Sequence, residues 1–188
     1  MRDQFTSSSI PPGLQRFALR LRLGGLIAFW VQLVLAVVST VILLVYVVFS
    51  NNPGRAGGTG TGLGIFFAIC GLVTLGVGTY WAFRYVRMAK ALLEPNNSRR
   101  PSKAETIQAL QTGVAINLAG MLLTLVGAQA IIGSTLGRSL SQQPGLIVRG
   151  QIIEPIDLFV VQANTNTIFA HFAGLVAALW LLSRINKG

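Results

Sequence analysis

The polar residues best placed to do chemistry are clustered in one stretch near the C-terminus. Residues 161–167 read VQANTNT, and His171, the one histidine of the chain, follows shortly after. At helical spacing Asn164, Thr167 and His171 share one face. Such groups can line a polar cavity that conducts a small cation, or they can hydrogen-bond one another where helices pack. Which of the two applies depends on the helices around them.

Neither a catalytic set nor a metal site accompanies these residues. The sequence has no carboxylate pair within an uncharged stretch, no recognisable Ser/His/Asp set, no HExxH and no CxxC motif. One histidine and one cysteine, Cys70, are too few to form a metal site by their spacing. We therefore expect a protein that is not an enzyme and that needs no metal or other cofactor.

Four long stretches of the chain contain no Lys, Arg, Asp or Glu. They are Leu23–Pro53, Leu63–Phe83, Thr106–Leu136 and Leu158–Ser183. A helix needs about 20 apolar residues to cross the hydrocarbon layer, so each stretch is long enough to span a membrane. We predict an all-α integral membrane protein, a compact bundle of four transmembrane helices at about residues 23–50, 63–83, 107–136 and 158–183.

The basic residues are concentrated on one side of these spans. Residues 1–22, 84–106 and 184–188 hold 12 of the 15 Lys and Arg residues, and the two opposite connections hold the other three. This bias predicts that both termini and the middle connection are cytoplasmic. The expected basic cytoplasmic surface comprises Arg84, Arg87, Lys90, Arg99, Arg100 and Lys103. Such charges set topology and attract anionic lipids; without a recognition fold they do not indicate nucleic-acid binding.

Small residues recur at seven-residue spacing in the second and third spans. The glycines expected to pack the helices are Gly64, Gly71, Gly78, Gly113, Gly120 and Gly127. Small residues let helix backbones approach closely in a membrane, so these two helices should make the closest contact of the bundle. Polar residues accompany the stripes: Gln32 lies in the first span and Asn117 in the third.

These polar side chains admit two interpretations. Gln32, Asn117, Asn164, Thr167 and His171 could line one polar cavity, or they could satisfy one another as an interhelical network. We favour the network, because hydrogen bonds in membranes commonly serve helix association. Gln162, Thr165 and Asn166 lie off this face, so the fourth helix should contact protein on several sides.

Two segments at the basic side have their own pattern. We expect residues 1–22 to form an N-terminal cytoplasmic segment and residues 23–188 to form the membrane domain. Within the first segment, Leu14–Arg22 is expected to be a basic amphipathic helix that either lies on the inner leaflet or acts as a charge anchor. The connection 84–106 is expected to be the tip of a projecting hairpin. Within it, Ser102 and Glu105 form a capping box, which predicts that the third helix begins near Lys103.

Two runs resemble an integral membrane family of photosynthetic organisms. Phe17–Val38 (FALRLRLGGLIAFWVQLVLAVV) and Pro155–Leu182 (PIDLFVVQANTNTIFAHFAGLVAALWLL) are similar to a chloroplast inner-envelope family and its cyanobacterial relatives. That family is described both as a component of the Tic import translocon and as "permease in chloroplasts", an iron carrier. The resemblance implies a four-span layout and a photosynthetic membrane, and it transfers no residue role. The absence of a transit peptide suggests a cyanobacterial plasma or thylakoid membrane rather than the chloroplast inner envelope.

Two functions follow as expectations. The first is a non-enzymatic accessory protein that acts through membrane-protein partners in assembly, insertion or a translocon. Its expected partners are membrane lipids and either other membrane proteins or a second copy of the chain. The alternative is a permease subunit for a small cation such as iron, with Asn164 and His171 along the path.

Overall fold

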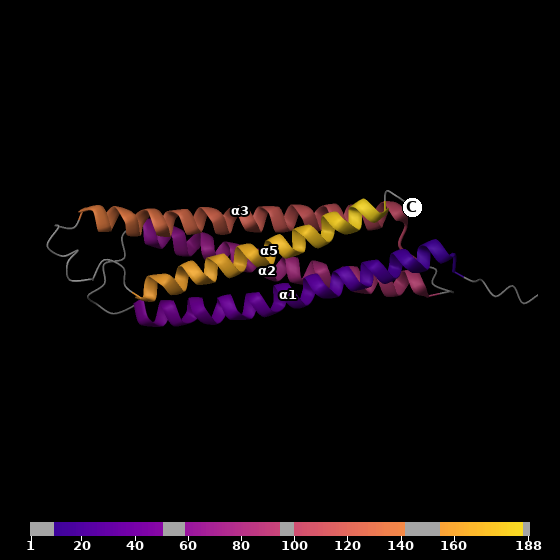
Figure 1. Cartoon of the computed structure of the whole chain (residues 1–188), viewed down its shortest axis with the longest axis horizontal. Coiled ribbons are helices and arrows are strands. Elements are labelled where there is room, and N and C mark those ends of the chain that lie inside the picture. The colour runs from indigo at the N-terminus through magenta and orange to yellow at the C-terminus, as the bar shows by residue number, and fades with distance from the viewer. Residues whose placement is uncertain (1–9, 51–58, 95–99, 142–154, 186–188) are drawn as a thin grey trace, which may run out of the picture.

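Each of the four predicted spans, at about residues 23–50, 63–83, 107–136 and 158–183, lies within one long helix. The computed structural model describes residues 10–50, 59–94, 100–141 and 155–185. Its helices are α1 (Pro12–Ser50), α2 (Thr59–Leu93), α3 (Lys103–Ser141) and α5 (Pro155–Ile185) (Figure 1). All four are long and apolar enough to cross a membrane. The described residues form no strand, so the predicted all-α, four-span fold class is confirmed.

The helices run up and down, so their charged ends meet. α1 and α3 begin, and α2 and α5 end, at the same end of the bundle (Figure 1). We call it the basic end, defined by Arg22, Arg84, Lys103 and Arg184. The compartment that this end faces remains a prediction from the charge bias.

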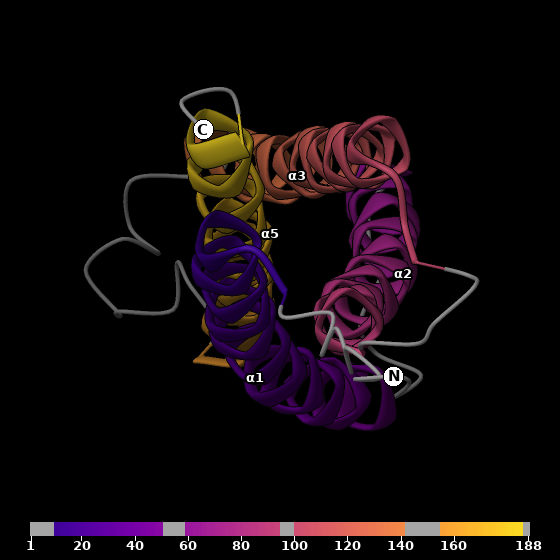
Figure 2. The same cartoon turned by 90° about the vertical axis from the view of Figure 1, so that its right-hand side faces the viewer.

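The four helices form a ring in the order α1, α2, α3, α5 (Figure 2). The contact between α2 and α3 is the most extensive, as the glycine stripes predict, and the contact between α1 and α5 follows. Across the ring, α2 and α5 approach one another, whereas the backbones of α1 and α3 do not meet within the described residues. The bundle is therefore flattened along the α2–α5 diagonal.

The expected surface helix at the N-terminus is not a separate element. Leu14–Arg22 forms the first turns of α1 and continues without a break into the span. Ala18 and Leu21 are fully buried and belong to a core cluster with residues of the other three helices, among them Tyr85 and Leu181. The apolar face of the segment packs on protein instead of on the leaflet.

The predicted start of α3 is confirmed. The Ser102 N–H donates to Glu105 Oε2 at 2.8 Å, and the Glu105 N–H donates to Ser102 Oγ at 3.1 Å. This reciprocal capping box satisfies donors that a helix N-terminus leaves free, which is why α3 begins at Lys103.

Candidate functional site

A cluster of three polar side chains joins the middle of the bundle. Gln32 Nε2 on α1 donates to Asn117 Oδ1 on α3 at 2.6 Å, and His171 Nδ1 on α5 lies 3.3 Å from the same oxygen. His171 Nε2 lies 3.2 Å from the carbonyl oxygen of Gly71 on α2. Gln32 and His171 are fully buried and Asn117 is nearly so. Every helix therefore contributes to one polar contact set, which we call the four-helix cluster.

Two glycines make room for the bond between Gln32 and Asn117. α1 and α3 are not neighbours, so this bond must cross the diagonal on which α2 and α5 approach. A Cβ on Gly174 of α5 would overlap Gln32 Nε2, and a Cβ on Gly78 of α2 would lie 3.2 Å from Asn117 Oδ1 and 3.3 Å from Gln32 Nε2. The bond thus occupies a slot between two glycines, one on each flanking helix.

His171 is held against α3 and α2 in a similar way. A Cβ on Gly120 would overlap the His171 ring. Both ring nitrogens face oxygen atoms. Asn117 Nδ2 donates to Gly113 O at 2.8 Å, so Asn117 Oδ1 faces His171 Nδ1, and Gly71 O faces His171 Nε2. A neutral imidazole has one N–H and can donate to only one of these two acceptors.

Two of the five predicted cluster residues, Thr167 and Asn164, form no hydrogen bond with the other three among the described residues. Thr167 is buried but donates to Ala163 O of its own helix at 2.8 Å. Ser39 on α1 donates to the same carbonyl at 3.1 Å, which ties α1 to α5. Asn164 is also buried, and its Nδ2 has no partner among the described residues; the same holds for Oε1 of Gln32.

The six stripe glycines lie at contacts between helices. All are buried, and an added Cβ would come within about 3.2 Å of another helix at each. On Gly71 it would overlap Thr124 Oγ1, on Gly64 it would overlap Ile131, and on Gly113 it would overlap the Tyr85 hydroxyl. Here the backbones come close because the side chains are missing.

Three grooves lined by described residues lie at the basic end, away from the cluster. One lies between α2 and α3, a second is adjacent on α2, and a third is lined by the ends of all four helices. None is lined by Gln32, Asn117 or His171. The four-helix cluster is a packed contact, because its side chains are buried and lie directly against Gly78, Gly120 and Gly174.

The predicted basic surface is only partly described. Arg84, Arg87 and Lys90 are exposed on α2, and Lys103 is exposed at the start of α3. Arg100 donates to Glu94 O at 3.0 Å, and Arg99 lies outside the described residues. The Arg84 guanidinium stacks 4.7 Å from the centre of the Trp81 ring.

Comparison with known proteins places the chain in a family. A family profile described as "Protein of unknown function (DUF3611)" matches residues 11–186, nearly the whole sequence. The chain belongs to the DUF3611 family. A relative with curated information is "Protein TIC 21, chloroplastic" of Arabidopsis thaliana, which is 33% identical over 174 residues. This confirms the resemblance drawn from Phe17–Val38 and Pro155–Leu182.

The coverage of that match is unequal. It includes 87% of this chain but 55% of the Arabidopsis protein, so the DUF3611 chain spans about half the length of its relative. No solved structure matches this chain.

Sequence reasoning missed the aromatic contacts between α2 and α3 of this DUF3611 member. Trp81 Nε1 donates to Ala109 O at 2.8 Å, and the Tyr85 hydroxyl lies 3.4 Å from the same oxygen. The signal was present, because Tyr85 follows Gly78 by two helical turns and so faces the Gly113 stripe.

Proposed function

We propose that this protein is a non-enzymatic accessory that acts by binding other membrane proteins, in assembly, insertion or a translocon-type role in a photosynthetic membrane. The family match supports the setting, because the Arabidopsis relative is named as a chloroplastic TIC protein. The mode of action rests on one observation from the outer surface of the bundle.

That observation is a polar patch on the outward face of α5, formed by Gln162, Thr165 and Asn166. Gln162 and Thr165 are exposed and Asn166 is half-buried. Gln162 Nε2 donates to Asn166 Oδ1 at 2.9 Å, and Phe159 and Phe169, which precede and follow the pair by three residues along α5, are exposed. An amide that faces hydrocarbon is costly, whereas amides that face another transmembrane helix form interhelical hydrogen bonds. The patch is therefore suited to contact a helix of a partner.

The test replaces the patch without altering the bundle. In the double variant Gln162→Leu, Asn166→Leu, both side chains remain similar in size but lose their hydrogen-bonding groups. Affinity purification from the native membrane in mild detergent should recover stoichiometric membrane proteins with the unaltered chain and markedly less of them with the double variant. The matched control is Gln111→Leu, an exposed glutamine on α3 that lies outside the patch.

Two outcomes would contradict the proposal. One is that the double variant and the unaltered chain recover the same partners in the same amounts. The other is that only a second copy of this chain is recovered, which would make the patch a contact between identical subunits.

A permease subunit for a small cation is the second candidate. Its support is the unpartnered Gln32 Oε1 and Asn164 Nδ2, which are buried polar atoms that a water or a cation-bound water would satisfy. Flux through the bundle would require the packed contact at His171 to open. Liposomes that contain the purified chain should then show ferrous-ion uptake that falls with His171→Ala, and absence of uptake in both forms would remove this candidate.

A further inference from the structure

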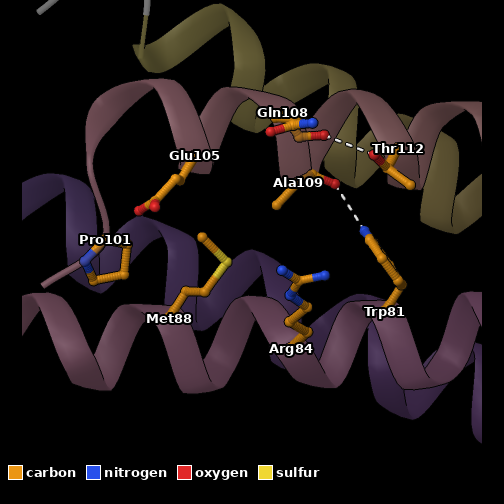
Figure 3. Close-up of a pocket in the computed structure, with 8 residues that line it drawn as sticks. All are labelled: Trp81, Arg84, Met88, Pro101, Glu105, Gln108, Ala109 and Thr112. Atoms are coloured by element: carbon orange, nitrogen blue, oxygen red, sulfur yellow. Dashed lines mark hydrogen bonds between the residues drawn. The ribbon is translucent and has the colours of Figure 1, made fainter. Parts of the chain in front are cut away.

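An open groove of about 450 Å³ lies between α2 and α3 near the basic end (Figure 3). Trp81, Arg84 and Met88 line it from α2, and Glu105, Gln108 and Thr112 line it from α3. Figure 3 shows the Arg84 guanidinium directed from α2 into this gap, with Trp81 beside it. The groove opens outward, so its occupant must come from the surroundings of the bundle.

Arg84 lies deeper than the other charges of the basic end. Its neighbour Trp81 bonds Ala109 O, which places this part of α2 beside a part of α3 that is already uncharged. Lys103 and Glu105 are the first charged residues of α3, and both lie about one turn or more closer to the basic end than Ala109 does. A tryptophan at this depth is typical of the boundary between hydrocarbon and headgroups.

The Arg84 guanidinium is available to bind an anion. No hydrogen bond or ion pair of the described residues occupies it, and its face stacks on Trp81. Glu105, the acidic residue of the groove, uses one carboxylate oxygen to accept from the Ser102 N–H. Arg84 also lines the adjacent groove on α2 with Arg87, so the local charge around it is positive.

We propose that this groove binds an anionic glycerophospholipid whose headgroup carries hydroxyl groups, as phosphatidylglycerol does. The phosphodiester is held by Arg84, whose planar fork suits phosphate oxygens and whose face remains on Trp81. The headgroup hydroxyls donate to the second carboxylate oxygen of Glu105 and accept from the Gln108 amide. Arg84 and Arg87 outnumber Glu105 around the groove, so the net local charge is positive and favours a lipid of net negative charge.

The surface next to the groove suits the acyl chains of such a lipid. Tyr80 and Phe83, which line the adjacent groove, are exposed, and Val77 and Val73 continue the exposed apolar surface along α2. Chains that descend from a phosphate at Arg84 would cover these side chains. One lipid molecule therefore matches both the charge and the apolar face.

The experiment measures lipid binding to the full chain by native mass spectrometry. The protein is purified in mild detergent, stripped of lipid and titrated separately with phosphatidylglycerol, phosphatidylethanolamine and inorganic phosphate. Arg84→Gln should weaken phosphatidylglycerol binding about tenfold, the effect of one charge-assisted hydrogen-bonded contact. Arg184→Gln is the matched control: Arg184 also stacks on a tryptophan, Trp180, but lines a different groove, and its loss should change binding less than twofold.

Three results would overturn the inference. Equal losses in Arg84→Gln and Arg184→Gln would mean that net charge alone attracts the lipid. Binding of phosphatidylethanolamine as tight as that of phosphatidylglycerol would exclude an anionic preference. Displacement of the lipid by millimolar inorganic phosphate would indicate a site for free anions.

A second variant keeps the test valid if Arg84→Gln does not fold. Arg84→Lys retains the charge but loses the planar fork and stacking, so phosphatidylglycerol binding should fall about threefold, whereas Arg184→Lys should leave it unchanged. Equal binding by all of these proteins would refute the site. The inference does not depend on the protein partners proposed above, because it is tested with purified protein and lipid.

Discussion

The Nδ1 of His171 lies 3.3 Å from the Oδ1 of Asn117, and that oxygen also accepts the Gln32 amide at 2.6 Å. One amide oxygen on α3 thus contacts side chains from two other helices. One is α5, its neighbour in the ring, and the other is α1, which lies diagonally across the ring. Asn117 Oδ1 is therefore the atom that joins the Gln32 and His171 contacts of the four-helix cluster.

The contact between these two residues should be measurable as a coupling energy. His171→Ala removes a fully buried ring and should lower the free energy of unfolding by about 2–4 kcal/mol. In a double-mutant cycle with Asn117→Ala, the coupling should be about 0.6 kcal/mol, the average for hydrogen bonds within membranes, and no more than about 1.7 kcal/mol, the maximum. Reversible unfolding in mixed micelles measures both quantities. The exposed Thr165→Ala serves as the control and should change stability by less than about 0.5 kcal/mol.

The slot between Gly78 and Gly174 should not tolerate a methyl group. Gly174→Ala places a Cβ on the Gln32 amide and should destabilise the bundle by about 1–3 kcal/mol through overpacking. Gly76→Ala on α2 is the matched control, because nothing lies within 4 Å of its added Cβ, and its higher helix propensity should leave stability unchanged or raise it by up to about 1 kcal/mol. Equal stability of both variants in the same unfolding assay would exclude the slot.

The capping box at the start of α3 should contribute modestly to the stability of the protein. Ser102→Ala removes the Oγ that accepts the Glu105 N–H and should cost about 1 kcal/mol. Glu105→Gln keeps a side chain that can return to the Ser102 N–H, so it should cost less. Hydrogen exchange of the amides in the first turn of α3 localises the effect. An unchanged exchange rate in Ser102→Ala would argue against the box.

The orientation can be tested with single cysteines. In a Cys70→Ala background, Ala104→Cys places a thiol at the basic end and Leu140→Cys places one at the opposite end; both positions are exposed. If the basic end is cytoplasmic, a membrane-impermeant maleimide added to intact cells should label Leu140→Cys and not Ala104→Cys. The reverse pattern would overturn the charge-based orientation.

Much of the fold follows from the sequence because it depends on local rules. Charge-free runs longer than a membrane is thick specify spans, and Ser102 with Glu105 specifies a helix start. The seven-residue spacing of Gly71 and Gly78 specifies which face of α2 meets its neighbour. The surroundings of the N-terminal segment did not follow from its sequence, because the same amphipathic pattern fits a lipid surface and a protein surface equally well.

The candidate site was predictable in its members but not in its connections. Gln32, Asn117 and His171 are all polar residues within uncharged spans, so sequence singles them out. Whether they meet depends on the order of helices in the ring and on their relative heights, which are long-range properties. Thr167 illustrates the limit: it shares the face of His171, yet it bonds the backbone of its own helix.

The bond from Gln32 to Asn117 also has a mechanical consequence. The two most extensive interfaces divide the protein into an α2–α3 pair and an α1–α5 pair. Packed helices commonly change arrangement by small sliding movements, and sliding of one pair along the other would first have to break this diagonal bond. The Gln32 amide, together with the two contacts of His171, therefore resists sliding of one half-bundle along the other.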